Sequence, residues 1–154
     1  MKVVIFVLKL AGILFFLSVL GSLGLYSYAQ FYGPVGPVPG GELKGQFTDF
    51  DPDWALLLPK GQFIEVQFGE EDPYSVTLDP HVVNGELYTW SRSENSWSEL
   101  IEEQPKAIVR IAGNLYRTTA SRVSDNELLA EVNKDRTGVP EAIGVSFHLS
   151  LHSF

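Results

Sequence analysis

A long apolar stretch at the start of the chain separates it into two parts. Residues 10–32 carry no charged side chain and consist mainly of Leu, Phe, Ile and Val. An α-helix rises about 1.5 Å per residue, so about 20 apolar residues cross a hydrocarbon core of about 30 Å. The stretch is therefore long enough to span a membrane, and we interpret residues 1–32 as an N-terminal membrane anchor.

The charges on either side predict how this span is oriented. Lys2 and Lys9 precede it, and the first charged residues after it are Glu42 and Lys44. Because positive charges favour the cytoplasmic side, the N-terminus stays inside and the rest of the chain is exported. We expect a single-pass protein of the cytoplasmic (inner) membrane with a periplasmic domain.

The same stretch also has features of a cleaved signal peptide. Ser27-Tyr28-Ala29 places small residues where a signal peptidase would cut. Two features favour a retained anchor instead. The apolar run is longer than the usual signal core of about 7–15 residues. An aromatic cluster suited to the outer membrane interface also lies at its end, formed by Tyr26, Tyr28, Phe31 and Tyr32.

Alternation of apolar and polar residues dominates the exported part and predicts a mainly β (α+β) domain. Residues 33–60 begin with a Gly- and Pro-rich run that disfavours helix and central strand, and we interpret them as a linker and packing segment. Residues 61–154 form the β domain. Its half-buried strands are expected at 63–68, 74–78, 81–83, 86–90, 107–111, 115–123 and 145–151.

Turn residues connect these strands. Asn84-Gly85 supplies the positive φ angles of a type I′ turn and predicts a two-residue hairpin. A second hairpin is expected around Gly113-Asn114. Asp79-Pro80 lacks a backbone donor for the sheet and predicts a bulge, an edge or a barrel corner.

Capping signals predict short helices between the strands. Ser96 and Glu99 have the spacing of a capping box, which predicts a helix over 97–103 that Pro105 stops. A second box, from Ser124 to Glu127, predicts a helix that runs to about Arg136. Earlier in the chain, Asp51-Pro52 is typical of a helix cap followed by the first helical residue.

Charge and composition exclude several function classes. The 154 residues include 19 acidic and 11 basic side chains, which gives a net charge of −8, and no cysteine. An acidic surface repels phosphate backbones, so nucleic acid is not an expected partner. The lack of cysteine excludes disulfides, thiolate metal sites and a cysteine nucleophile. His148 and His152 lie roughly 13 Å apart along one strand and cannot share a metal ion, so we predict no metal site.

The order of these elements carries a resemblance over about residues 61–124, with 145–151 as a closing strand. The segments that carry it are Tyr74-Ser75-Val76-Thr77, Asn84-Gly85-Glu86-Leu87-Tyr88, the helix before Pro105, Val109-Arg110-Ile111 and Gly113-Asn114-Leu115-Tyr116. This pattern resembles the flavin-binding split β-barrel superfamily, which includes pyridoxamine-phosphate-oxidase-like proteins and deazaflavin-dependent nitroreductases. The resemblance implies a split β-barrel-like domain with two short helices, so together with the apolar stretch we expect an N-terminal transmembrane helix followed by such a domain.

The resemblance also implies a place for a cofactor. In that superfamily, basic and hydroxyl residues after the hairpin hold the phosphate of the ligand, and the matching positions here are Ser91, Arg92, Ser93, Asn95 and Ser96. FMN would suit such a site. Trp97 stands where a basic residue is expected, and residues 69–72 are acidic where the deazaflavin branch is basic. Deazaflavin is therefore less compatible with this chain than FMN.

Two classes of function follow from these observations. The first is a membrane-anchored, extracytoplasmic ligand-binding or interaction module that has lost the cofactor. The alternative is a flavin-dependent oxidoreductase of the pyridoxamine-phosphate-oxidase-like superfamily, although no residue is identified as catalytic. The expected partners are the membrane, a flat conjugated small molecule and a second copy of the chain in a homodimer.

Overall fold

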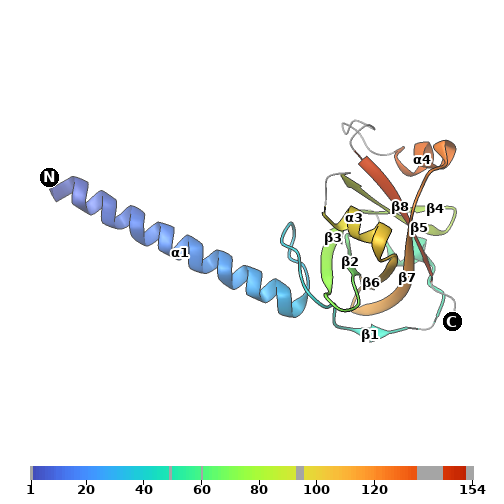
Figure 1. The fold of residues 1–154 in the computed structure, drawn as a ribbon, viewed down its shortest axis with the longest axis horizontal. Coiled ribbons are helices and arrows are strands. Elements are labelled where there is room, and N and C mark those ends of the chain that lie inside the picture. The colour runs from blue at the N-terminus through green and yellow to red at the C-terminus, as the bar shows by residue number, and fades with distance from the viewer. Residues whose placement is uncertain (1, 49, 60, 93–95, 135–143, 152–154) are drawn as a thin grey trace.

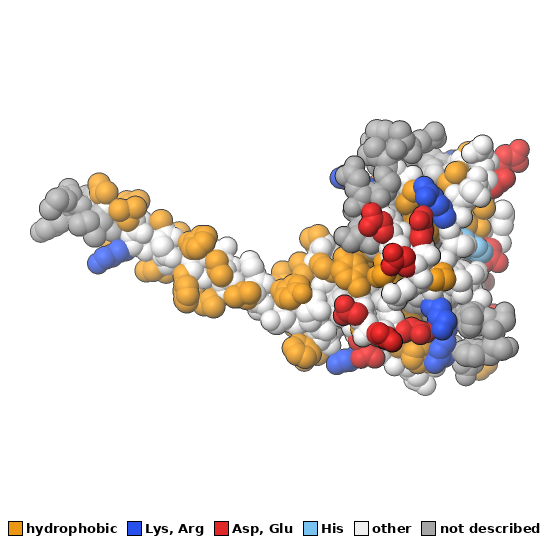
Figure 2. Space-filling model, in the orientation of Figure 1, with side chains coloured by type: hydrophobic (Ala, Val, Ile, Leu, Met, Phe, Trp, Pro, Cys, Tyr) orange, Lys and Arg blue, Asp and Glu red, His pale blue; other side chains and the backbone are white. Residues whose placement is uncertain are grey.

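The computed structural model shows a long N-terminal helix that runs into a β domain (Figure 1). It describes residues 2–48, 50–59, 61–92, 96–134 and 144–151. Helix α1 (Lys2–Tyr32) contains the 27-residue stretch Phe6–Tyr32, whose mean hydropathy is 2.2. Figure 2 shows hydrophobic side chains along the whole visible face of this helix. The predicted span is therefore one continuous helix that is long and apolar enough to cross a membrane, a property that signal sequences share.

The β domain is an α+β fold built on one curled sheet. Its strands follow the order β3-β2-β6-β7-β8-β5-β4 with antiparallel neighbours, and β1 pairs in parallel with the start of β7. The strands are β1 (Gln46–Phe47), β2 (Ile64–Phe68), β3 (Tyr74–Leu78), β4 (Pro80–Val83), β5 (Glu86–Arg92), β6 (Lys106–Ile111), β7 (Asn114–Arg122) and β8 (Gly144–Leu151). The helices of the domain are α2 (Trp54–Leu57), α3 (Ser96–Glu103) and α4 (Asn126–Val132).

The curl of the sheet depends on the corner at Asp79. Strands β3 and β4 lie at opposite ends of the sheet order, yet only Asp79 separates them in the chain. Leu78 pairs with β2, whereas Pro80 pairs with Thr89 of β5. The hydroxyl of Thr89 donates a hydrogen bond of 3.3 Å to the carbonyl of Asp79. The chain thus changes partner strands here, which confirms the predicted barrel corner and gives a half-barrel.

Both predicted hairpins are present, but one turn lies a residue earlier than expected. Asn84 and Gly85 have φ angles of 53° and 85°, as a type I′ turn requires. In the second hairpin the positive φ angles belong to Ala112 and Gly113 instead of Gly113 and Asn114. Asn114 pairs with Ile111 and also with β1, so it already belongs to strand β7.

The helix caps correct two further predictions. Helix α4 is capped by Asp125, whose carboxylate accepts a hydrogen bond of 2.8 Å from the backbone of Leu128, and not by Ser124. Helix α2 is capped by Asp53 instead of Asp51. In each case the cap reaches the amide three residues later, and the predicted residue lies too early to do so. Helix α4 ends at Val132, and the predicted end at Arg136 lies outside the described residues.

The core fills the half-barrel beneath α3. The ring of Trp97 on α3 stacks on Phe68 at a centroid distance of 5.6 Å and contacts Phe147 at 5.6 Å. Strand β8 alternates as predicted, because Val145, Phe147 and Leu149 are buried in the core. A smaller cluster packs beneath α4 and contains Tyr88, Val123 and Val132.

Candidate functional site

The Gly- and Pro-rich residues 33–41, which we call the strap, fold into a fixed loop. Val35 and Val38 exchange two backbone hydrogen bonds of 3.0 Å and form a tight hairpin. Gly40 then exchanges two more with Ser75 on β3, at 2.8 and 2.9 Å. A Cβ on Gly40 would lie 2.6 Å from the carbonyl carbon of Gly33, so only glycine fits. The strap is therefore built onto the edge of the sheet.

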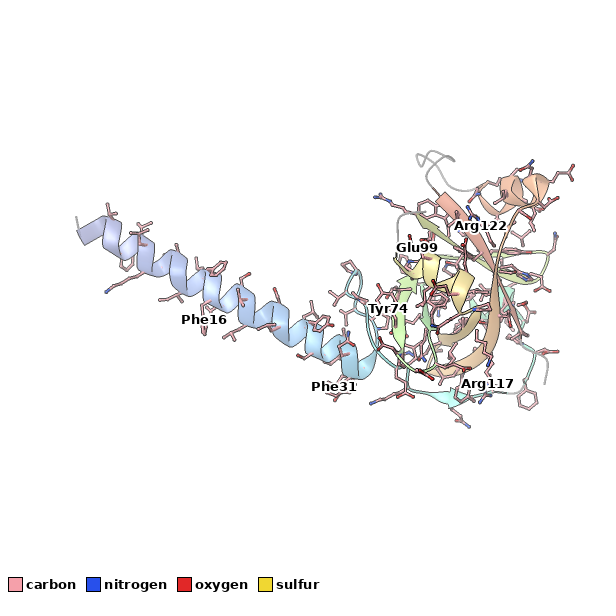
Figure 3. The ribbon with its side chains drawn as sticks, viewed as in Figure 1. Phe16, Phe31, Tyr74, Glu99, Arg117 and Arg122 are labelled. Atoms are coloured by element: carbon pink, nitrogen blue, oxygen red, sulfur yellow. The ribbon has the colours of Figure 1, made fainter. Side chains whose placement is uncertain are left out.

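A pocket of about 330 Å³ lies between the strap and the half-barrel. Strap residues 36–39 form one wall, and residues of β3, β5 and α3 form the others. Figure 3 shows Tyr74 of β3, a lining residue, on the side of the domain where the strap lies. The lining also includes Thr77, Trp90, Ser91 and Trp97. The pocket thus brings one of the predicted site residues, Ser91, next to two indole rings.

The two tryptophans of this pocket have different environments. Trp97 is only 5% exposed and its ring is held between Phe68 and Phe147, so it belongs mainly to the core. Trp90 is half-buried and its indole lies directly over the backbone of Gly144, where an added Cβ would come within 2.0 Å of the indole nitrogen. The absence of a side chain at Gly144 therefore leaves room for the indole of Trp90.

Of the predicted site residues that the structure describes, Ser91 alone lines this pocket. Ser91 is buried and its hydroxyl donates a hydrogen bond of 2.8 Å to the carbonyl of Arg92. The side chain of Arg92 is exposed, as expected because successive strand residues point to opposite faces. Ser96 begins helix α3, and Ser93 and Asn95 lie outside the described residues. Arg92 is not among the described residues that line the pocket.

Comparison with known proteins identifies the fold. No protein-family model matches the chain, and no curated protein matches it in sequence. Among solved structures, a pyridoxamine 5′-phosphate oxidase candidate from Listeria innocua shares 18% identity, covers 64% of this chain and 90% of its own, and has a TM-score of 0.52. An FAD-binding protein from Mesorhizobium loti shares 15% identity over 64% of this chain and 86% of its own, with a TM-score of 0.47.

The chain has a split-barrel fold. The Listeria structure decides this, because 90% of its length aligns with this chain at a TM-score above 0.5. The predicted resemblance is thus confirmed as a likeness of fold.

Carboxylates dominate the surface next to α3. A larger hollow of about 840 Å³ is lined by Glu70, Glu71, Asp72 and Glu103, and its cation Lys106 is paired with Glu70 at 2.9 Å. Figure 2 shows acidic side chains gathered on this face. Such a surface repels a phosphate group. The described part of this split barrel therefore offers a flat ring a neutral aromatic pocket, but it does not offer the phosphate of FMN a cationic cradle beside it.

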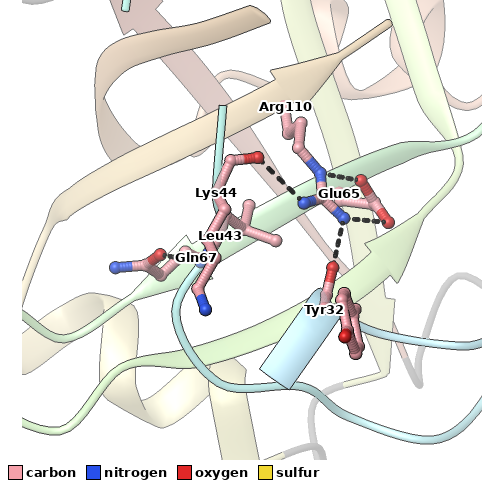
Figure 4. A network of polar contacts seen from close by, with 6 residues as sticks. All are labelled: Tyr32, Leu43, Lys44, Glu65, Gln67 and Arg110. Atoms are coloured by element: carbon pink, nitrogen blue, oxygen red, sulfur yellow. Dashed lines mark hydrogen bonds and ion pairs between the residues drawn. The ribbon is translucent and has the colours of Figure 1, made fainter. Parts of the chain in front are cut away.

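The sequence analysis missed a network of polar contacts that is centred on Arg110. Its guanidinium forms a two-pronged ion pair with Glu65, through Nε to one oxygen and through Nη2 to the other at 2.8 Å (Figure 4). It also donates to the carbonyls of Tyr32 at 3.0 Å and Lys44 at 3.1 Å. We call this contact the Arg110 clamp. Its hydrogen bond to Glu65 raises the pKa of Arg110 above the ordinary value, so the group stays charged.

The clamp joins segments that are far apart in the chain. Glu65 and Arg110 are direct partners on β2 and β6, while Tyr32 is the last residue of α1 and Lys44 follows the strap. Nearby, Gln67 accepts a hydrogen bond of 2.7 Å from the backbone of Leu43. Opposite charges at matching positions of neighbouring strands were the available signal for the ion pair. No sequence signal indicated the contact with the helix.

A second polar contact, between His148 and Glu86, lies near α4. The imidazole of His148 is 3.0 Å from a carboxylate oxygen of Glu86 and stacks on the ring of Tyr88 at 4.9 Å. Burial, followed by the nearby charges of Glu86 and Glu131, raises the pKa of Tyr88. His148 is therefore a packed and paired residue, and its predicted neighbour on the strand, His152, lies outside the described residues.

Proposed function

We propose that this protein is a membrane-anchored split-barrel module that binds a flat conjugated small molecule in the pocket beneath the strap. The observation that carries the proposal is the lining of that pocket, which combines the aromatic residue Trp90 with the hydroxyl-bearing residues Thr77 and Ser91. Indole faces stack on flat rings, and hydroxyls bond to ring heteroatoms. A flavin has both properties and is the first ligand to test.

The charge of the pocket favours recognition of the ring over recognition of a phosphate. The described lining contains no charged side chain. The nearest predicted cation in the chain, Arg92, is exposed and is not among the described residues that line the pocket. We therefore expect riboflavin, which lacks the phosphate, to bind about as tightly as FMN. A flavin oxidoreductase that holds FMN through its phosphate is the alternative.

Contacts at the end of α1 support its retention as an anchor. Ala29, the last residue of the predicted signal-peptidase site, is fully buried against the domain. Its carbonyl accepts a hydrogen bond of 2.9 Å from Gly33, and the carbonyl of Tyr32 is held by Arg110. Cleavage after Ala29 would remove this buried residue and the carbonyl to which Gly33 donates, while Tyr32 would stay with the domain. Mass spectrometry of the membrane-bound protein should recover an N-terminal peptide that includes Lys9.

The binding proposal is tested on the full chain purified in detergent. A visible absorption spectrum records any chromophore that copurifies, and titration with riboflavin and with FMN follows the quenching of flavin fluorescence. Trp90→Leu should weaken both ligands, because it removes the stacking face. The matched control Trp54→Leu changes a tryptophan that contacts Tyr116 away from the pocket, and it should leave any remaining folded protein able to bind.

The Arg92→Ala variant distinguishes recognition of the ring alone from recognition of FMN through its phosphate. Arg92→Ala should leave both affinities unchanged if the ring alone is recognised. A selective loss of FMN binding would instead favour the phosphate-holding oxidoreductase. If the protein carries no chromophore and takes up neither flavin, flavin binding is refuted.

A cofactor-free interaction module is the second candidate, and the acidic surface beside α3 favours it. Four carboxylates gather there, at Glu70, Glu71, Asp72 and Glu103, and they would disfavour an anionic cofactor. Such a module should cross-link to a specific envelope protein in intact cells, and Arg92→Ala should not alter the cross-link. Loss of flavin binding with Arg92→Ala would argue against it.

A further inference from the structure

The uncharged part of the chain continues beyond the end of the membrane helix. Residues 10–41 include no charged side chain, although α1 ends at Tyr32. The strap accounts for the last nine of these residues and contributes only Gly, Pro and Val. A solvated periplasmic loop has no need of such a composition, whereas a segment that lies in the interface of a membrane does.

The strap begins and ends at the same point, the last turn of α1. A Cβ on Gly40 would lie 2.6 Å from the carbonyl carbon of Gly33, and one on Gly41 would lie 2.7 Å from the carbonyl of Gln30. The side chain of Gln30 also donates to the carbonyl of Pro39 at 3.4 Å. Figure 1 shows the resulting loop beside the end of α1, on the side of the domain that the helix enters. Its tip, Gly36-Pro37, is exposed.

The depth of this loop follows from the helix. The 27 residues of Phe6–Tyr32 extend about 40 Å, which matches a hydrocarbon core together with its headgroup regions. The exposed aromatic rings of Tyr28, Phe31 and Tyr32 then lie at the outer interface, the depth that aromatic belts prefer. Because the strap is held to this last turn at both ends, it lies at the same depth.

The Arg110 clamp prevents the domain from swinging away from this position. Arg110 binds the final carbonyl of α1 and, through Glu65, is fixed to β2. Gly33 packs directly against the guanidinium of Arg110, because a Cβ on Gly33 would come within 2.4 Å of it. The orientation of the helix relative to the half-barrel is therefore set by packed contacts and not by a loose tether.

We propose that the strap tip and the rings of Tyr28, Phe31 and Tyr32 form one contact surface for the outer headgroup layer of the membrane, which seats the split barrel against the bilayer. The partner is the lipid surface itself. The inference rests on α1 being a retained anchor, as proposed above. The proposal predicts that Pro37 contacts lipid, although Pro37 lies outside helix α1.

The chain offers a clean test because it contains no native cysteine. P37C, F16C and E127C are each labelled with an environment-sensitive fluorophore and reconstituted as full chains in phosphatidylcholine vesicles. Vesicles are prepared with nitroxide on the lipid headgroup or on the acyl chain. Phe16 lies within the span, and Glu127 is exposed on α4, which Figure 1 places on the side away from α1. Unchanged tryptophan emission confirms that each variant is folded.

The three labelled positions test the membrane anchor and the contact of the strap tip with lipid separately. We expect loss of emission at residue 37 with headgroup nitroxide, loss at residue 16 with acyl-chain nitroxide, and no loss at residue 127 with either. Quenching at residue 16 without quenching at residue 37 would overturn the seating of the domain while the anchor stands. No quenching at residue 16 would overturn both the anchor and the contact.

Discussion

Removal of the Arg110 clamp should destabilise the domain far more than removal of an ordinary surface ion pair. Arg110→Ala deletes the ion pair with Glu65 and two hydrogen bonds to backbone carbonyls. It also leaves the carboxylate of Glu65 in a site where its side chain is 28% exposed and lacks its cation. An unpaired and partly buried charge is costly, because the desolvation it suffered on folding is no longer compensated.

The size of the effect can be worked from the burial of the pair. Breaking a fully buried ion pair costs about 3–5 kcal/mol. Side-chain exposures of 15% for Arg110 and 28% for Glu65 allow some solvation, so we expect a loss of about 2–3 kcal/mol in the free energy of unfolding. For a domain of this size, that loss lowers the melting temperature by about 8–12 °C.

Urea unfolding of the full chain in detergent measures this loss, followed by the emission of the three tryptophans, all of which lie in the domain. Arg122→Ala is a matched control, because Arg122 pairs with Glu102 at 3.2 Å with both side chains more than half exposed. Exposed pairs contribute about 0–1 kcal/mol. The double variant with Glu65→Ala should recover part of the stability, since no charge is then left unpaired.

A loss of less than about 1 kcal/mol for Arg110→Ala, no larger than that of the control, would refute this reasoning. The clamp would then be a solvated contact that does not fix the helix to the half-barrel. The membrane seating inferred from it would have to depend on the strap alone.

Three further predictions concern the strap, a helix cap and the pH response. Gly40→Ala forces a Cβ against backbone atoms at 2.6 Å and should lower the unfolding free energy by about 1–3 kcal/mol in the same urea assay, whereas Gly24→Ala, which meets nothing within 4 Å, should not. Asp125→Ala should lower it by about 1 kcal/mol through loss of the α4 cap, and Ser124→Ala should have almost no effect if the cap is assigned correctly. Burial raises the pKa of Tyr88, so its unfolded form ionises first and stability falls as pH rises above about 10; Tyr88→Phe should make the curve flatter at alkaline pH.

Local chemistry explains what could be predicted from the sequence. The Asn84-Gly85 turn, the corner at Asp79-Pro80 and the inward face of β8 depend on the residues themselves or on a period of two. The helix caps were missed by one or two residues because Asp and Ser neighbours compete for the same role. Asp125 prevails over Ser124 because its carboxylate reaches the amide of Leu128.

Contacts between distant segments could not be predicted in this way. The clamp joins Arg110 to residues 45, 66 and 78 positions away, and no periodicity links such positions. The strap was expected to be part of a linker and packing segment, and its pairing with Ser75 depends on glycine allowing two backbones to approach. The Arg110 clamp and the strap together determine how α1 is positioned on the half-barrel. This arrangement could therefore be seen only in the structure.

Ser91 and Arg92 are neighbours on β5 but have different environments, because Ser91 is buried and Arg92 is exposed. A strand exposes alternate residues on opposite faces, so a displacement of one residue moves a side chain to the other side of the sheet. Here Ser91 lines the pocket, whereas Arg92 is exposed and is not among the described lining residues. The described lining therefore lacks the charge that the resemblance led us to expect from Arg92, and the neutral aromatic lining is the property that we propose selects the ligand. This is why the comparison of riboflavin with FMN, which differ by that phosphate alone, is more informative for this split barrel than a test of FMN by itself.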